Sequence, residues 1–394
     1  MPKVIEALAT MKNDQLATIL PSPIREIDAN FSTIPGILKL TLGEPDFAVP
    51  DHIKSAAKKA IDDDDSHYAP AWGHLSLRNE IAAYLKRRFQ LSYQPETEVL
   101  VTVGASEAIY ATMHGLFNPG DQIIIPTPTF PMYEAIAQAM GVEVVGINTA
   151  PDFILTPEKL KYALQTHPKV KGVMFNYPSN PTGVTYDSQQ IQAIATVIAE
   201  NDLLVISDEI YAELVYEGEH QSIAEILPQQ TILISGLSKS HAMTGYRLGY
   251  VTGPAALMKH IGKMHQFLVT TAPGPMMAAA EEALKHGQDD ATKMRDIYQQ
   301  RRDLLLSGLQ QLGFEAVAPG GAFYMFVKIP DFLNQDDVAF IYDVAEKVKL
   351  GIVPGSMFGA GGEGYVRLSY AASLEDLQEA VNRLSQYIAL ETTH

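Results

Sequence analysis

The sequence of 394 residues contains no cysteine. This absence excludes disulfide bonds, thiolate metal sites and cysteine nucleophiles, and it is compatible with a cytoplasmic location. Basic residues are scarce too: 29 lysines and arginines stand against 46 aspartates and glutamates, a formal net charge of −17. Because no basic stripe offsets this charge, we expect neither nucleic acid nor an anionic membrane as a partner. An anionic ligand must then be held by a few local cations and backbone amides.

Long apolar runs are also missing. No stretch approaches the roughly 20 residues that a membrane-spanning helix needs. The first twenty residues have no continuous apolar stretch and contain Asp14, which argues against a signal peptide. The chain is 46% hydrophobic and 19% charged, as in ordinary globular proteins. We therefore expect a soluble, cytoplasmic protein of two or three domains.

What the sequence does have is a series of strand-like apolar runs that alternate with helical segments. Several runs are apolar on both faces, which is typical of a sheet covered by helices on both sides. They indicate an α/β fold with a mostly parallel seven-stranded sheet. The runs are 99–103, 122–125, 142–147, 172–175, 203–207, 231–235 and 248–252.

The remaining segments suggest how the chain is divided. Residues 1–47 are expected to form an N-terminal arm and part of a small domain, with a strand at 38–42. Residues 48–288 would form the large domain. A long helix at about 289–312 would then introduce a smaller α+β C-terminal domain, residues 289–394.

Small and polar residues gather where the predicted strands end. In open α/β sheets, ligands bind beyond the carboxyl ends of the strands. The residues at these ends are Gly104, Ala105, Ser106, Asn180, Asp208, Tyr211, Lys239 and Arg247. Taken singly, each has a simpler interpretation, such as a helix cap for Asp208 or a solvated side chain for Lys239. Their arrival at successive strand ends favours one shared site.

Lys239 is the most informative of these residues. A lysine at the mouth of a buried sheet is desolvated, and a neutral amine is a nucleophile that can form a Schiff base. Arg247, eight residues later, offers a planar fork of donors suited to a phosphate. Together they suit an aldehyde cofactor that carries a phosphate.

The motifs resemble those of a known family. GLSKSHAMTGYRLG at 236–249 is similar to the pyridoxal-phosphate attachment signature of class I/II aminotransferases of fold type I. Further similar segments are GEPDF at 43–47, GASEA at 104–108, NYPSNPTG at 176–183, DEIY at 208–211 and VRLSYA at 366–371. The resemblance covers nearly the whole chain. It is strongest to the bacterial subgroup of aromatic and N-acetyl-diaminopimelate aminotransferases.

The resemblance implies pyridoxal 5′-phosphate as the cofactor. Lys239 would bind it covalently and then move the proton between the substrate Cα and the cofactor C4′. Asp208 would pair with the ring nitrogen, so that the ring acts as an electron sink. Asn180 and Tyr211 would hydrogen-bond the ring oxygen, and Phe130 would stack on the ring.

The resemblance also implies how the phosphate is held. Tyr68 matches a tyrosine that reaches the phosphate of the neighbouring subunit, which implies a homodimer with shared active sites. One departure is Gly236, where some relatives carry a phosphate-binding serine, so Ser238 is favoured over Ser235 for that role. The phosphate-binding residues within one chain would be Arg247, Ser238, Gly104, Ala105 and Ser106.

On the substrate side, the resemblance implies that Arg367 binds the α-carboxylate as a bidentate pair. Gly43 and Asn180 lie where the family makes its other contacts to that carboxylate. Ser106 stands where some aspartate-specific relatives carry a lysine, which puts strict acidic specificity in doubt.

We therefore expect an aminotransferase that moves the amino group of an L-amino acid to a 2-oxo acid, such as 2-oxoglutarate, by a ping-pong mechanism. The donor would be aromatic, or one of a broad set that includes aspartate. Alternatives are an N-acetyl-LL-diaminopimelate aminotransferase and a C–S β-lyase. The ligand-sensing module of a transcription regulator is disfavoured, because the chain is acidic and only about forty residues precede Gly43.

Two further patterns predict no chemistry. GAGGEG at 359–364 has the spacing of a dinucleotide-binding loop, but it precedes a strand-like segment, so we predict a plain loop. His260 and His265 are five residues apart, which does not place them on one helical face, and no metal site is expected there.

Overall fold

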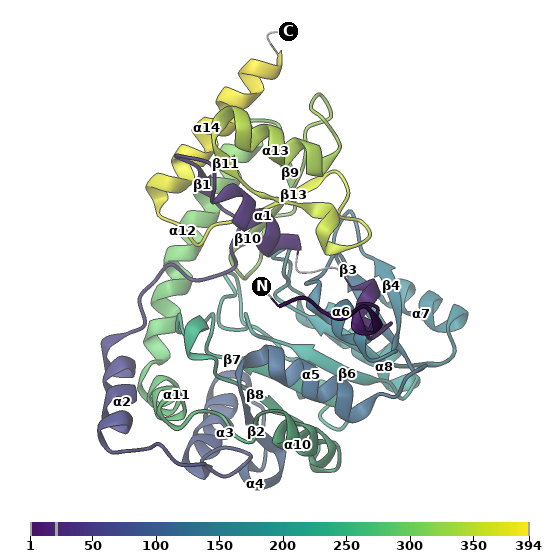
Figure 1. Cartoon of the computed structure of the whole chain (residues 1–394), viewed down its shortest axis with the longest axis vertical. Helices are drawn as coiled ribbons and strands as arrows, with labels where there is room; N and C mark the ends of the chain where they lie inside the picture. The colour runs from purple at the N-terminus through teal and green to yellow at the C-terminus, as the bar shows by residue number, and fades with distance from the viewer. Residues whose placement is uncertain (1, 20–22, 393–394) are drawn as a thin grey trace.

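The computed structural model describes residues 2–19 and 23–392. Figure 1 shows two lobes, the larger built around one sheet and the smaller above it, with helix α12 (Gln288–Gln311) running from one into the other. This helix corresponds to the one predicted at 289–312.

The larger lobe contains a seven-stranded sheet with the strand order β2-β8-β7-β6-β5-β3-β4. All strands run parallel except β8, which is antiparallel to both neighbours. The expected α/β fold with a mostly parallel sheet is thus confirmed, and each of the seven predicted runs is a strand. The strands are β2 (Val99–Thr102), β3 (Gln122–Thr127), β4 (Glu143–Asn148), β5 (Val170–Asn176), β6 (Leu204–Asp208), β7 (Thr231–Gly236) and β8 (Gly249–Thr252).

Both faces of this sheet are buried, and strand β5 shows why its sequence is apolar throughout. Met174 packs into a cluster with α5, α6 and α10, whereas Val173 and Phe175 pack on the opposite side with α7 and α8. Successive side chains of a strand point to opposite faces, so a sheet with two buried faces needs apolar residues at every position.

Helices cover the two faces of the sheet as two layers. On one face lie α5 (Gly104–Leu116), α6 (Met132–Ala139) and α10 (Ala255–Val269). On the other lie α2 (Asp51–Asp62), α3 (Leu75–Phe89), α7 (Pro157–Thr166), α8 (Ser188–Glu200), α9 (Ile223–Ile226) and α11 (Gly274–His286), while α4 (Pro95–Glu98) leads into β2.

The smaller lobe is built on a four-stranded antiparallel sheet with the order β12-β13-β10-β9. Its core joins side chains of the sheet to those of α1, α12, α13 and α14. The strands are β9 (Glu315–Ala316), β10 (Tyr324–Lys328), β12 (Val353–Pro354) and β13 (Tyr365–Ser369), and the helices not yet given are α1 (Pro23–Phe31), α13 (Asp337–Val348) and α14 (Leu374–Thr392). Short 3-10 turns are η1 (Glu6–Leu8), η2 (Leu16–Thr18), η3 (Thr244–Tyr246) and η4 (Gly355–Phe358).

The predicted strand at 38–42 is shorter than expected. Strand β1 (Leu38–Lys39) pairs in parallel with β11 (Leu350–Gly351) and ends at Lys39. The next residue, Leu40, changes partners: its amide donates to Gly351 and its carbonyl accepts from Ser369 of β13. Residues 41–46 therefore leave the two-stranded sheet and cross toward the larger lobe.

The glycine-rich segment at 359–364 and the lengths of the helices also bear on the predictions from the sequence. GAGGEG at 359–364 follows η4 and precedes β13, so it is a loop, as predicted. Over the described ranges, no helix has both the length and the apolarity to span a membrane.

Candidate active site

The strand ends meet at one edge of the seven-stranded sheet. Because β8 is antiparallel, its first residues lie beside the last residues of the parallel strands, and Gly249 pairs with Gly236 at the end of β7. Arg247 immediately precedes β8 and so returns to the edge where Lys239 and Asp208 lie. One antiparallel strand thus places the arginine with the other predicted residues.

Arg247 lies against the amino end of α5. It is exposed and donates from Nη1 to the carbonyl of Thr244, 2.9 Å away, and within the described chain it pairs with no carboxylate. A Cβ on Gly104 would lie only 2.5 Å from Nη2 of Arg247, and Gly104 has a φ of +77°, so glycine is required here. The free amides of Ala105 and Ser106 in the first turn of α5 and the guanidinium therefore form one anion-binding corner.

Two buried side chains brace the same turn. The Glu107 carboxylate accepts from the amide of Val103 at 2.9 Å and contacts Nδ1 of His265 at 3.0 Å. Nε2 of His265 lies 2.7 Å from the carbonyl of Ala71, so this histidine is engaged in structural contacts. Over residues 2–19 and 23–392, no cluster of three or more metal-ligating side chains occurs.

The structure gives a reason for the glycine at position 236. A Cβ there would lie 2.9 Å from both the carbonyl oxygen of Leu248 and the Cα of Gly249. A serine at this position would require the backbone of β8 to move. Ser238, favoured from the sequence, is buried beside Lys239, whereas the hydroxyl of Ser235 already donates to the carbonyl of Glu209 at 3.2 Å.

Lys239 is partly buried, and its amine donates to the carbonyl of Gly43 at 2.5 Å. Its Nζ lies 5.9 Å from the ring centroid of Tyr211 and 5.6 Å from that of Phe323. Burial lowers the pKa of Lys239 to about 8, and the charge of Arg367 acts in the same direction. Roughly a tenth of the amine is therefore neutral and nucleophilic at pH 7, far more than for a solvated lysine.

Asp208 is the last residue of β6 and is almost fully buried. Oδ2 accepts from the hydroxyl of Tyr133 at 2.7 Å, and Oδ1 accepts from the amide of Ile210 at 3.2 Å. Burial raises the pKa of Asp208 to about 6, although both hydrogen bonds act the other way. Each carboxylate oxygen accepts one of these bonds and an ionised carboxylate has about four acceptor sites, so Asp208 can still accept from a protonated ring nitrogen.

Tyr133 was not among the residues predicted from the sequence. It lies in the first turn of α6, and its ring makes an edge contact with that of Phe130, with centroids 5.8 Å apart. Phe130 follows strand β3 and so reaches the same sheet edge as Asp208. The spacing of three residues between Phe130 and Tyr133 was the available signal.

Asn176, the final residue of β5, was also missed. Its Nδ2 donates to the carbonyl of Asp208 at 2.9 Å, and its Oδ1 accepts from the amide of Asn180 at 3.0 Å. It thereby fixes the turn that carries Asn180 relative to Asp208. Tyr211, which is buried nearby, shares a 2.8 Å hydrogen bond with the hydroxyl of Tyr324.

Arg367 lies at the opposite end of the site, on β13 of the smaller lobe, and is 2% exposed. Nη1 donates to Oδ1 of Asn180 at 2.9 Å and Nη2 to the carbonyl of Thr41 at 2.5 Å. The guanidinium carbon lies 4.6 Å from the ring centroid of Tyr324 and 4.9 Å from that of Phe358. The two rings and two neutral oxygens thus fix its orientation.

The charge of Arg367 is not neutralised by the part of the chain that the structure describes. Its Nε is buried without a hydrogen-bond partner, and neither of its two bonded oxygens belongs to a carboxylate. Burial lowers the pKa of Arg367 from its ordinary value. A buried guanidinium without an anion is costly, which makes this position suited to a carboxylate ligand.

Tyr68 does not reach this site within one chain. It lies between α2 and α3 with 86% of its surface exposed. Its predicted contact with the phosphate of a neighbouring subunit stays a prediction.

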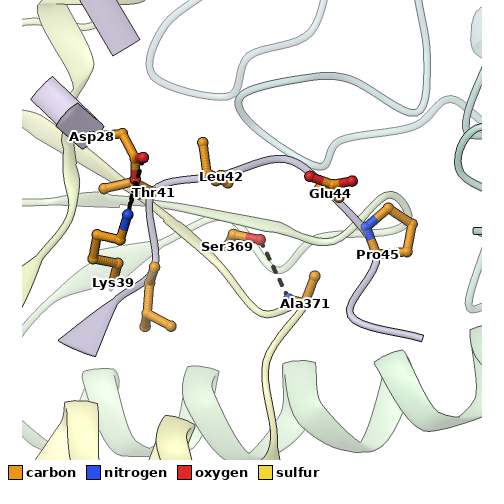
Figure 2. Close-up of a pocket in the computed structure, with 9 residues that line it drawn as sticks. Asp28, Lys39, Thr41, Leu42, Glu44, Pro45, Ser369 and Ala371 are labelled. Atoms are coloured by element: carbon orange, nitrogen blue, oxygen red, sulfur yellow. Dashed lines mark hydrogen bonds and ion pairs between the residues drawn. The ribbon is translucent and has the colours of Figure 1, made fainter. Parts of the chain in front are cut away.

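A cavity of about 280 Å³ lies beside the site. Figure 2 shows that segment 39–45 forms much of its wall, with Asp28, Ser369 and Ala371 from neighbouring elements. The carbonyls of Thr41 and Gly43 in this segment bind Arg367 and Lys239. The cavity therefore adjoins the residues that support the site.

Comparison with known proteins identifies the family. The family "Aminotransferase class I and II" matches residues 35–384. A Bacillus subtilis protein named "Probable N-acetyl-LL-diaminopimelate aminotransferase" is 41% identical over 377 residues, covering 95% of each chain. "Aromatic-amino-acid aminotransferase 2" of Thermococcus litoralis is 34% identical, covering 95% of this chain and 98% of its own.

Solved structures agree with this result. The aspartate aminotransferase of Thermus thermophilus with maleate matches with a TM-score of 0.90 at 34% identity, covering 95% of this chain and 99% of its own. The chain therefore belongs to the class I and II aminotransferases, a family that implies pyridoxal phosphate. The donor set fits that cofactor, because a corner that binds anions, a buried carboxylate and an amine of lowered pKa lie at one sheet edge.

Proposed function

We propose that this protein is a pyridoxal-phosphate-dependent aminotransferase that moves the amino group of an L-amino acid to a 2-oxo acid in two half-reactions. The observation that carries this proposal is the buried guanidinium of Arg367, which has no carboxylate partner in the described chain. Every amino acid and every 2-oxo acid brings an α-carboxylate. One fixed guanidinium can therefore serve both half-reactions.

In this proposal, the residues of the sheet edge hold the cofactor. Arg247, Ser238 and the amides of Ala105 and Ser106, in the turn that Gly104 opens, bind its phosphate. Phe130 packs on the ring and Asn180 and Tyr211 bind the ring oxygen. Asp208, ionised above about pH 6, keeps the ring nitrogen protonated. When bound, the cofactor supplies an electron sink for the electron pair that forms at the substrate Cα.

Lys239 has two tasks. It would hold the cofactor between reactions, and as a free amine it would move the proton at the substrate Cα. A base works best when its pKa lies near the working pH, and burial brings the pKa of Lys239 to about 8. The Gly43 carbonyl that accepts from this amine would help to orient it.

Arg367 positions the substrate. Its guanidinium is held in place by Asn180 and Thr41 and contacts the rings of Tyr324 and Phe358, so it needs no reorganisation when a carboxylate arrives. The α-carboxylate would take the donors that are still free, while Gly43 and Asn180 would provide the remaining contacts. This fixes which Cα bond faces the proton-moving lysine.

We propose an aromatic donor, or a broad set that includes aspartate, with 2-oxoglutarate as acceptor. N-acetyl-LL-diaminopimelate is a second candidate donor, which the 41% identical Bacillus subtilis relative favours. We further propose that the enzyme works as a cytoplasmic homodimer in which Tyr68 reaches the partner subunit's phosphate. Its exposure in the single chain supports this.

The test is a panel of donors against 2-oxoglutarate, in which both products are quantified. It should include phenylalanine, tyrosine, aspartate and N-acetyl-LL-diaminopimelate. Transamination gives one new 2-oxo acid for each glutamate formed. A sulfur-containing donor such as cystathionine tests the C–S β-lyase alternative, because release of pyruvate and ammonia without glutamate would support the lyase instead.

A further inference from the structure

The segment of residues 40–46 connects three parts of the candidate site. The carbonyl of Thr41 accepts from Arg367, and the carbonyl of Gly43 accepts from Lys239. The carboxylate of Glu44 accepts from the hydroxyl of Thr244, whose own carbonyl accepts from Arg247. The position of this segment therefore affects the substrate end and the cofactor end together.

Asp28 of α1 anchors the segment near its start. Its Oδ1 accepts from the hydroxyl of Thr41, which is fully buried. The amine of Lys39 lies 3.0 Å from both carboxylate oxygens and 2.8 Å from the hydroxyl of Ser32. Figure 2 shows Asp28, Lys39 and Thr41 turned toward one another at one end of the cavity.

A second anchor holds the other end. Both oxygens of Asp46 accept from Arg301 of α12 at 2.8 Å, a bidentate pair. The guanidinium carbon of Arg301 lies 5.0 Å from the ring centroid of Phe47 and 5.5 Å from that of Tyr298. Between these anchors the segment borders the cavity of about 280 Å³, which leaves room for it to shift if one anchor is lost.

We propose that Asp28 is a positioning residue for substrate binding, which acts through the Thr41 hydroxyl. By fixing Thr41, Asp28 fixes the backbone carbonyl that holds Nη2 of Arg367 at 2.5 Å, and with it the angle at which the guanidinium meets the substrate carboxylate. This inference rests on the proposed role of Arg367 in binding that carboxylate.

The hydroxyl of Thr41 is the sharpest place to interrupt this relay. Thr41→Val removes the donor but keeps the side-chain shape and the backbone carbonyl, and Asp28 keeps its ion pair with Lys39. A hydrogen bond to a charged group is worth a factor of roughly ten or more. Thr41→Val should therefore raise KM roughly tenfold for every donor and acceptor, while kcat changes little.

The matched variants separate positioning from folding. Thr41→Ser keeps a hydroxyl and should restore the KM of the unmodified enzyme. Asp28→Ala should reproduce the effect of Thr41→Val. Ser32→Ala removes a hydrogen bond from the same Lys39 without touching Thr41, so its KM should stay unchanged. The thermal midpoint and the affinity for pyridoxal phosphate, measured on each variant, show whether the fold and the cofactor site are intact.

Four outcomes decide the matter when Arg367→Ala is measured alongside. A raised KM in Thr41→Val that Thr41→Ser restores supports the relay. A raised KM in Arg367→Ala with none in Thr41→Val overturns the relay and leaves the role of Arg367 intact. If Arg367→Ala itself leaves KM unchanged, the proposed role of Arg367 in binding the carboxylate is wrong, and the relay that rests on it is wrong too. A loss of kcat and stability in Thr41→Val that Thr41→Ser does not restore would assign the bond a structural role only, against the proposal.

Discussion

Arg247 and Arg367 carry the same charge at two ends of one site, yet their surroundings are opposite. Arg247 is exposed at the sheet edge and is bound by one carbonyl, beside the free amides of α5. Arg367 is 2% exposed, contacts two aromatic rings and donates to two neutral oxygens. The sheet provides the first arginine, and the smaller lobe provides the second.

This difference matches two kinds of ligand. A phosphate that stays bound can be held by many donors of modest strength, and the loss of any one is tolerated. A carboxylate that binds and leaves in each half-reaction gains most from a guanidinium whose orientation is already fixed. We infer that the exposed arginine serves the resident group and the buried arginine serves the substrate.

The largest effect should come from Lys239, whose pKa both arginines lower. Lys239→Ala removes both the covalent attachment and the proton-moving base, so we expect transamination to fall by roughly 10³-fold or more. The visible absorption band of the bound cofactor should change at the same time. Near-normal turnover of Lys239→Ala, measured with any donor from the panel, would contradict the role of this lysine.

Arg367→Ala should have the next largest effect. Truncating one partner of a buried charge pair typically costs about 2–5 kcal/mol, which corresponds to a rise in KM of roughly 30-fold or more. The rise should appear for all amino and oxo acids, because the α-carboxylate is common to them. Steady-state kinetics with several donors checks this, and a loss confined to one substrate would count against it.

Arg247→Ala should have a smaller effect of a different kind. One exposed charge-assisted bond among several is worth about 1 kcal/mol, so cofactor affinity should fall roughly fivefold and KM should change little. Equilibrium dialysis of the cofactor measures the affinity. Added salt should weaken cofactor binding more than it weakens carboxylate binding at the buried Arg367, since exposed charges are screened more. If salt weakened cofactor binding and carboxylate binding equally, the proposed distinction between an exposed Arg247 and a buried Arg367 would be contradicted.

The smallest expected effect is a shift in the pKa of Lys239 when a neighbouring charge is removed. In the cofactor-free protein, the acylation rate of Lys239 should rise with pH around a midpoint of about 8. A neighbouring cation disfavours the ammonium form, so removing one raises the pKa and moves the midpoint to higher pH. Arg367→Met should move it further than Arg247→Met, because the buried charge is less screened.

Glu44 provides a control for the acylation experiment, because its charge shifts the pKa of Lys239 in the direction opposite to that of the arginines. Its carboxylate raises the pKa of Lys239, so Glu44→Gln should move the midpoint to lower pH. Mass spectrometry of the acylated protein at a series of pH values gives the midpoint for each of the three variants, to be compared with that of the unmodified protein. Midpoints that do not move in any variant would show that burial alone sets this pKa.

Much of the fold followed from the sequence, for a physical reason. Strands buried on both faces are apolar at every position, so all seven strands of the large sheet were detectable. The strand predicted at 38–42 was too long, because the apolar residues Leu38, Leu40 and Leu42 continue the alternation that is typical of a strand. In the structure, Leu42 is 42% exposed and pairs with no strand.

The supporting residues of the site were harder to predict. Tyr133 meets Asp208 across 75 residues of sequence, and Thr41 meets Arg367 across 326. The first contact joins side chains from two distant elements, and its local signal was the spacing of Phe130 and Tyr133. The second uses a backbone carbonyl, which has no sequence signature. Asn176 could have been found, because it pairs in register with Asp208 at the ends of β5 and β6.

A single half-reaction tests the proposed transamination most directly. The protein loaded with pyridoxal phosphate is mixed with an excess of its best donor and no acceptor, and the products are quantified. We expect one equivalent of 2-oxo acid per chain, after which formation stops until 2-oxoglutarate is added. Continuous release of 2-oxo acid and ammonia without an acceptor would contradict it.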